Sequence, residues 1–185
     1  MQACRTLFLL LWLFLSLSNG NAQAVYKCFL QMDGLPGQST DAQHKNWCDI
    51  LSFQLGDTNA IAHSGSGGPS VGRPSLFNLV VVKEIDNTSP LLTLRCAMGQ
   101  TITKVTLVCA KRGPHPIDFY KVTISEVLIA GVRVTGDVDA TSPLPVESIS
   151  FNYRKVKWEY VPQNQNGTMG PPVTGEWDAD TNTGH

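Results

Sequence analysis

A histidine and a serine stand side by side at positions 63 and 64, and these residue types serve as base and nucleophile in hydrolases. Residues adjacent in sequence rarely form such a pair, and the chain contains no G-x-S-x-G turn to present a nucleophilic serine. The run from Gly65 to Gly68 lacks the Lys-Ser/Thr that completes a phosphate-binding loop. We therefore expect a flexible loop around His63 and Ser64, no catalytic residue and no enzyme activity.

Potential metal ligands are scattered along the sequence. The histidines do not follow the spacing of a zinc site; they are His44, His63, His115 and His185. A series of aspartates misses the D-x-D-x-D-G order of a calcium loop; they are Asp33, Asp41, Asp49 and Asp57. We expect no metal and no cofactor, with turn-capping roles for the aspartates and a structural hydrogen-bonding role for His44.

The balanced charge of the chain argues against a nucleic-acid partner. The 185 residues are 42% hydrophobic and 16% charged, which is typical of one ordinary globular domain with a short additional segment. The formal net charge is −1, whereas a nucleic-acid-binding domain is expected to carry a basic excess.

The N-terminus has the order of a secretory signal peptide. Arg5 supplies a positive charge, an apolar run follows over residues 7–17, and an Ala-Gln-Ala site for signal peptidase ends at Ala24. The apolar run is too short for a membrane span, which needs about 20 apolar residues. We therefore expect residues 1–24 to be cleaved off between Ala24 and Val25. The mature protein is then secreted or periplasmic and has no membrane contact.

Export would place the remaining cysteines in an oxidising compartment. Cys4 belongs to the leader, and the mature chain keeps Cys28, Cys48, Cys96 and Cys109. An even number in an exported chain favours two disulfides over four buried thiols, and the spacing matches no Cys-x-x-Cys motif. Three connectivities are possible. We prefer Cys28–Cys48 and Cys96–Cys109 because each closes a short loop between consecutive elements.

The mature chain consists mainly of short apolar runs typical of β-strands. Strands are expected over residues 25–32, 47–55, 76–85, 103–111, 117–130, 132–135 and 147–161. In the last run the alternation changes phase near Arg154, which indicates a bulge or two halves that bury opposite faces. One helix is expected, with Ser89 as N-cap, Pro90 at the first helical position and Gly99 as C-cap.

The segments between these elements differ in length. Residues 57–74 are rich in glycine, serine and proline and are predicted to form a long flexible loop.

Many short strands and a single helix indicate a mainly β fold, a small barrel or sandwich with the helix packed at one opening or side.

The stretch from Asp33 to Gly56, DGLPGQSTDAQHKNWCDILSFQLG, resembles the Hcp family (hemolysin-coregulated protein), the tube subunit of bacterial type VI secretion. Family members usually have a glutamate where this chain has Gln38. The resemblance continues in order along the chain at Lys83, Asp86, Ser89-Pro90, Cys96-Ala97, Gly99, Tyr120-Lys121-Val122-Thr123, Pro145, Glu147-Ser148, Phe151-Asn152, Lys155, Glu159-Tyr160, Gly167, Gly170, Gly175, Trp177 and Asp178.

The resemblance implies an Hcp-like β-barrel with one helix over residues 25–178, followed by a flexible tail over residues 179–185. It implies a structural subunit whose partner is itself: hexameric rings that stack into a tube and carry secreted effectors. We assign subunit or ring-to-ring contacts to the loop of residues 57–74, with Asp57, His63, Ser64 and Arg73 as candidate contact residues.

The leader leaves two alternatives open, because the family's tube assembles in the cytosol, where a signal peptide has no role. One alternative is an exported, disulfide-bonded Hcp-like binding protein or effector that is not part of a contractile tube. The other is a start codon assigned too far upstream. A secreted hydrolase has only the compartment in its favour.

Overall fold

The computed structural model describes residues 26–62, 70–113, 116–137, 144–164 and 167–185. The predicted signal peptide and its cleavage site at Ala24 and Val25 lie outside the described residues. The elements are β1 (Tyr26–Met32), β2 (Cys48–Ile50), β3 (Ser52–Gln54), β4 (Asp57–Ala62), β5 (Ser70–Leu76), β6 (Leu79–Glu84), α2 (Ser89–Met98), β7 (Thr101–Lys111), β8 (Ile117–Thr135), β9 (Val146–Asn152), β10 (Lys155–Tyr160), β11 (Val173–Asp178) and β12 (Thr183–Gly184).

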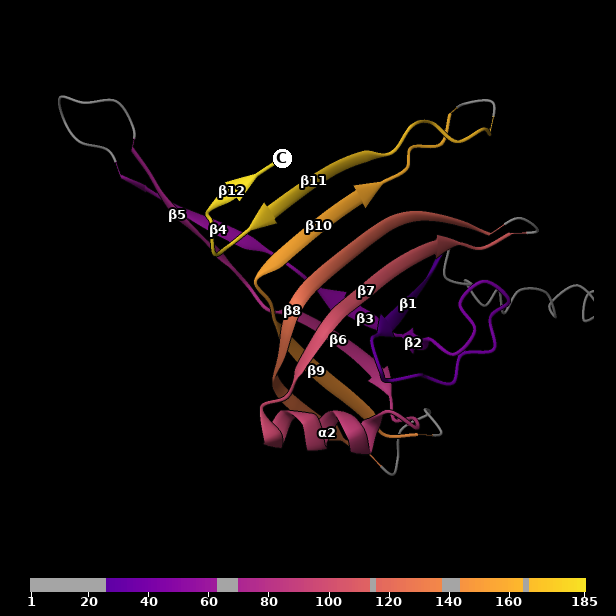
Figure 1. Cartoon of the computed structure of the whole chain (residues 1–185). Coiled ribbons are helices and arrows are strands. Elements are labelled where there is room, and N and C mark those ends of the chain that lie inside the picture. The colour runs from indigo at the N-terminus through magenta and orange to yellow at the C-terminus, as the bar shows by residue number, and fades with distance from the viewer. Residues whose placement is uncertain (1–25, 63–69, 114–115, 138–143, 165–166) are drawn as a thin grey trace, which may run out of the picture.

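The strand β8 is shared by two parts of the main sheet (Figure 1). Its residues 120–125 pair with β10, and its residues 128–135 pair with β9. The register shifts between Ile129 and Gly131, so a bulge lets one continuous strand bend where the sequence predicted two strands. The predicted strand of residues 147–161 is instead two, β9 and β10, because the phase change near Arg154 sends its halves to different parts of β8.

The remaining strands curl the sheet into a barrel-like layer around one core. The pairing runs from β8 through β7 and β1 to β2 on one side, and through β9 and β6 to β3 on the other. Only Leu51 separates β2 from β3, and its backbone N–H donates to Val82 O at 2.8 Å. The bent β2–β3 segment therefore spans from β1 to β6. The predicted mainly β fold with one helix is confirmed.

Alternating side chains of these strands fill the core. In β6, Leu79, Val81 and Lys83 are buried while the residues between them are partly exposed, and β9 buries Ile149 and Phe151 in the same way. This period of two is what a strand with one interior face requires. Lys83 in β6 and Glu147 in β9 are the exceptions, because they are charged residues at interior positions.

The helix α2 lies across one end of the barrel (Figure 1). The N-cap is Thr88 and not the predicted Ser89, so the helix begins one residue earlier than predicted. Gly99 ends it as predicted, with φ of 62° in the left-handed region where glycine costs least. Leu92 is fully buried, whereas Leu91, Leu94 and Met98 are exposed. No helix in the described part of the chain is long and apolar enough to cross a membrane.

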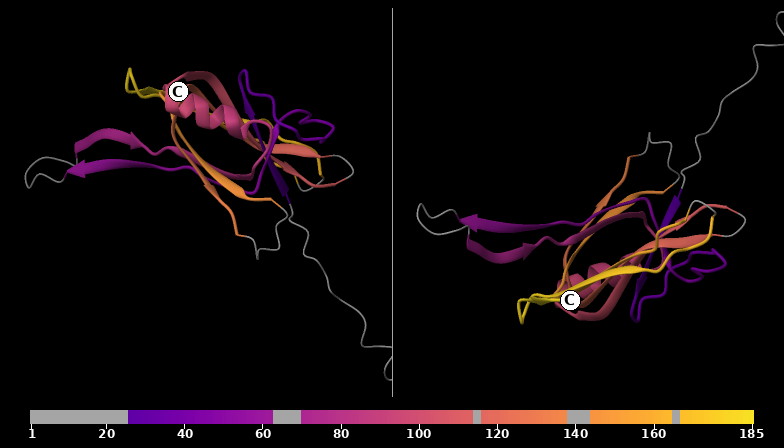
Figure 2. Two further views of the ribbon diagram at one scale, coloured as in Figure 1. Left: turned by 90° about the horizontal axis from the view of Figure 1, so that it is seen from below. Right: turned by 90° about the horizontal axis from the view of Figure 1, so that it is seen from above.

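The segment predicted as a long flexible loop is instead a β-hairpin. β4 and β5 pair with each other over Asp57↔Leu76 to Ala62↔Ser70, and the hairpin projects from the barrel (Figures 1 and 2). The strands could not be recognised in the sequence, because the segment is rich in glycine and serine and has no apolar alternation. β4 and β5 form a separate two-stranded sheet. Residues 179–185, predicted as a flexible tail, form a turn and the short strand β12, which pairs with β11.

The cysteine pairing differs from the prediction. Cys28 on β1 and Cys109 on β7 lie directly opposite each other, with a Cα–Cα distance of 4.2 Å, and form a disulfide. Cys48 and Cys96 are free. The preferred pairs Cys28–Cys48 and Cys96–Cys109 were wrong because of the strand register: β2 does pair with β1, but it places Ile50 opposite Cys28, whereas β7 places Cys109 there. Cys48 lies opposite Leu30, and the Cys96 thiol donates to Ile129 O at 3.5 Å.

Replacing Cys109 by alanine should lower the free energy of unfolding by about 2–5 kcal/mol, because the bond closes a loop of 81 residues in the unfolded chain. Chemical denaturation of the oxidised protein measures the loss. Cys96→Ala, which removes a free thiol, is the matched control and should cost less. Peptide mapping without reductant should recover Cys28 linked to Cys109; a Cys28–Cys48 peptide would contradict the assignment.

Candidate functional site

The described interior contains a cluster of three charged side chains beside the start of α2. The Lys83 ammonium lies 2.7 Å from Asp86 Oδ1 and 2.7 Å from Glu147 Oε1. It also donates to Glu84 O at 3.2 Å, so all three of its N–H groups have acceptors. Lys83 and Glu147 are completely buried, and only 5% of the Asp86 side chain is exposed. We call Lys83, Asp86 and Glu147 the ionic cluster.

The ionic cluster fixes the first turn of the helix. Ser89 Oγ donates to Glu147 Oε1 at 2.7 Å and accepts from the Asp86 backbone N–H at 2.9 Å. Asp86 Oδ1 in turn accepts from the Thr88 backbone N–H at 2.8 Å and from the Thr88 hydroxyl at 2.6 Å. Burial alone would raise the pKa of Asp86, but these hydrogen bonds and the Lys83 charge hold it below its usual value.

A serine, a lysine and a carboxylate this close resemble catalytic chemistry, but their arrangement is that of a structural joint. Ser89 donates its proton to a carboxylate that is itself bound to Lys83, and the ammonium and the Glu147 carboxylate are sealed from solvent. A substrate has no access to either group. The cluster joins β6, β9 and α2 at one point.

A second buried polar group fixes the loop between β1 and β2. His44 is stacked on Phe29 at a ring distance of 4.2 Å, and its ring edge meets Trp47 at 5.1 Å. Its Nδ1 lies 3.0 Å from Asp41 Oδ1 and its Nε2 lies 3.2 Å from Asp118 Oδ1. The predicted structural hydrogen-bonding role of His44 is confirmed.

Gly37 in the same loop is required for close packing. A Cβ atom at this position would lie 2.4 Å from the backbone oxygen of Trp47, which is well inside contact distance. The Gly37 N–H donates to Asn46 O at 2.7 Å, and Ser39 N–H donates to Trp47 O at 2.8 Å. The loop therefore folds back on itself through its backbone, and any side chain at Gly37 would separate the two segments.

The other predicted site residues are not brought together. Asp57 opens β4, while His63, Ser64 and His115 lie outside the described residues. Arg73, predicted as a donor to a neighbouring subunit, donates to the backbone oxygen of Ala179 in its own chain. Within the described ranges no group of histidine, cysteine and acidic side chains has the geometry to hold a metal ion.

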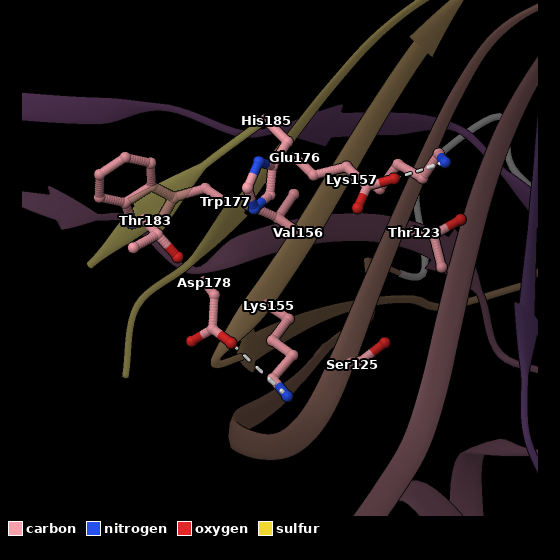
Figure 3. A pocket seen from close by; sticks show the side chains of 10 residues that line it. All are labelled: Thr123, Ser125, Lys155, Val156, Lys157, Glu176, Trp177, Asp178, Thr183 and His185. Carbon is pink, nitrogen blue, oxygen red and sulfur yellow. Dashed lines mark ion pairs between the residues drawn. The ribbon is translucent and has the colours of Figure 1, made fainter. Parts of the chain in front are cut away.

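One outer face of the β8–β10–β11 layer carries cross-strand ion pairs (Figure 3). Lys157 lies 2.5 Å from Glu176, and Lys155 lies 3.1 Å from Glu126 and 3.6 Å from Asp178. The two lysines, Glu176 and Asp178 line a pocket of about 380 Å³ together with Val156, Trp177 and His185. Because each lysine has a carboxylate partner, the pocket presents no excess of positive charge.

Comparison with known proteins identifies the chain. Residues 29–160 match the family model described as "Type VI secretion system effector, Hcp". The chain belongs to the Hcp family. Protein hcp1 of Pseudomonas aeruginosa is 27% identical over 151 residues, which cover 80% of this chain and 92% of that protein. The predicted family and the predicted role as a subunit of the type VI secretion tube are confirmed.

Solved structures agree with this assignment. The structure of a type six secretion system protein has a TM-score of 0.82 and 30% identity, over 86% of this chain and 99% of that one. Hcp1 from Salmonella typhimurium has a TM-score of 0.71 and 30% identity, over 88% of this chain and 100% of that one. The Hcp fold therefore extends over nearly all of the described residues.

The ionic cluster explains several positions of the Hcp resemblance. Lys83, Asp86, Ser89 and Glu147 matched the family one by one, yet nothing in the sequence joined them into one network. The available signal was a lysine at an interior position of the alternating strand β6 and a glutamate at an interior position of β9. Two opposite charges at interior positions indicate a buried pair.

Replacing Lys83 by methionine should lower the free energy of unfolding by about 3–5 kcal/mol, because it leaves two buried carboxylates without a counter-charge. Urea denaturation measures the change. Lys121→Met is the matched control: its pair with Glu159 spans 3.7 Å at the surface and should contribute about 1 kcal/mol or less. Equal losses in the two variants would show that the ionic cluster has no special structural role.

Proposed function

We propose that this Hcp chain is an exported structural subunit that assembles with copies of itself into closed rings through its β4–β5 hairpin and its open strand edges. The observation that carries the proposal is the hairpin, which projects from the barrel and pairs with no other described strand (Figure 2). A two-stranded hairpin has little stability in water by itself. A neighbouring subunit would supply the surface that the hairpin lacks.

The strand edges support a ring rather than an open aggregate. Within the described residues β2 and β3 each have one unpaired edge, and β12 covers only the end of β11. Exposed edges promote uncontrolled pairing unless another chain covers them. A head-to-tail contact that closes on itself covers every such edge once and leaves none at the end of the assembly. Ring assembly is the behaviour of the Hcp family, and six subunits are our proposal for this chain.

The N-terminal segment determines where this assembly would act. We propose that residues 1–24 direct export and are removed, and that residues 25–178 form the working domain. A disulfide between Cys28 and Cys109 suits an oxidising compartment, because structural disulfides persist outside the cytosol. The role is structural and not catalytic, and secreted effectors are the proposed cargo.

A second function, that of a binding protein or effector, is compatible with the same two features. The same leader and disulfide would also suit an exported Hcp-like binding protein or effector that works outside a contractile tube. Such a protein would be monomeric or loosely associated. The oligomeric state of the exported protein therefore separates the two functions.

Replacing residues 60–72 by an Asn-Gly turn should convert rings to single subunits in sedimentation velocity, because the projecting part of the hairpin is lost. The melting temperature should change little, since the variant keeps Leu76, the hairpin residue that packs against the core among the side chains that the structure describes. A control that replaces only residues 63–69 by a Gly-Ser linker of equal length keeps the paired strands. A parent protein that is monomeric at high concentration would favour the second function.

The N-terminal residue of exported protein should be Val25, because the Ala-Gln-Ala site ends at Ala24. Edman sequencing or intact-mass measurement of material recovered outside the cytoplasm determines it. Ala24→Leu, which blocks the small-residue site, should leave the precursor uncleaved. Recovery of exported protein that still begins at Met1 would refute the leader.

A further inference from the structure

A pocket of about 440 Å³ lies between the base of the β4–β5 hairpin and the inner face of β10 and β11. Its apolar walls are Trp158, Trp177, Leu76 and Pro74, and its polar lining is Asp57, Thr58 and Asn59. This volume is within the range of small-ligand sites. The lining has a carboxylate, an amide and a hydroxyl, and it contains no basic residue.

The strand register places the two tryptophans on one face. Trp158 lies opposite Gly175 and Trp177 lies opposite Val156, so by the strand register the two residues are diagonal neighbours on one face, and Lys155 and Lys157 alternate to the other face. The Trp158 ring lies against Gly175, where a Cβ atom would be in ordinary contact with it at 3.8 Å. Both indoles are partly buried, so each retains accessible surface at the pocket.

The carboxylate of Asp57 is the source of the pocket's charge. Within the described part of the chain it forms no ion pair, and Arg73, the only Lys or Arg in the hairpin sequence, is directed to Ala179 O. The lysines of β10 are paired with carboxylates on the opposite face. The negative charge of Asp57 also acts on two nearby tyrosines. Burial is the main cause that raises the pKa of Tyr120 and that of Tyr153, the latter to about 12, and the Asp57 charge is the second cause.

We propose that this pocket is a binding site for organic cations, taking a guanidinium or a methylated ammonium group between the two indoles and the Asp57 carboxylate. A cation within about 6 Å of an indole face is attracted by the ring quadrupole, and a neighbouring carboxylate adds direct charge attraction. The same chemistry is found in an arginine side chain of another polypeptide and in a small quaternary amine. Every residue that the site needs belongs to one subunit, so a single subunit is sufficient for binding.

The test is a titration of the purified protein, monitored by the indole N–H resonances of Trp158 and Trp177, with Trp47 as internal reference. One arm compares choline with 3,3-dimethylbutanol, its neutral carbon isostere. The other compares acetyl-arginine amide with acetyl-citrulline amide. We expect saturable shifts at both indoles with at least one cation of the two arms and not with its neutral counterpart. The arm that saturates at lower concentration identifies the ligand source.

Asp57→Asn should weaken the binding of that cation by about tenfold or more, because it removes the charge and keeps the shape. Glu176→Gln is the matched control: it removes an equal charge beside Trp177 on the opposite face and should leave affinity unchanged. Equal shifts with cation and isostere, an unchanged affinity in Asp57→Asn, or no saturation with any of these compounds would overturn the proposal. The isostere comparison uses the unmodified protein and does not depend on a variant folding.

Discussion

The position of helix α2 depends on one ammonium group placed between two carboxylates inside the protein. Taking each of these ions out of water costs several kcal/mol, so the arrangement is stable only when every charge has its partner. Lys83 meets that condition with three acceptors, and Ser89 and Thr88 supply hydrogen bonds to the two carboxylates. A helix packed by apolar contacts alone could slide or rotate. The hydrogen bonds of this network are directional, so they fix the first turn of α2 in one position.

One atom of the network has no hydrogen-bond partner. Glu147 Oε2 is buried and has no hydrogen-bond partner among the described residues. A buried acceptor without a donor costs free energy, and proteins keep few of them. Its cost is tolerated because the other oxygen of the same carboxylate binds both Lys83 and Ser89. Removing Lys83 would leave the Glu147 carboxylate without its counter-charge, and removing Ser89 would take away one of the hydrogen bonds to that carboxylate.

Local chemistry made part of this fold predictable. Pro90 and Gly99 marked the helix within one residue, because proline and a left-handed glycine act on their own backbone. Alternation marked β9, because burial of one face imposes a period of two, whereas β6 was predicted from its density of apolar and β-branched residues. Gly131 misled the prediction of β8, since a glycine break and a glycine in a bulge look the same in sequence. The hairpin escaped detection because its glycines, serines and prolines show no apolar alternation.

The site depended on contacts between residues far apart in sequence, and these had no local signal. Glu147 lies 58 residues from Ser89, to which it is hydrogen-bonded. The four cysteines gave the chemistry of a disulfide but not its geometry, because the register of β1 against β7 decides which sulfurs meet. The family resemblance supplied the right residues one at a time. Only the three-dimensional arrangement assigns them to a shared network.

The pairing of β1 with β7 also imposes an order on folding. β1 is the first described strand of the chain, yet the residue opposite Cys28 comes 81 positions later. Contacts of such sequence separation form slowly, because a large loop must close before they contribute. A chain that leaves a membrane channel from its N-terminus could pair β1 with β2 early, but the other edge of β1 would stay unpaired until β7 has emerged. A holdase chaperone that binds extended apolar segments would find its target in that interval.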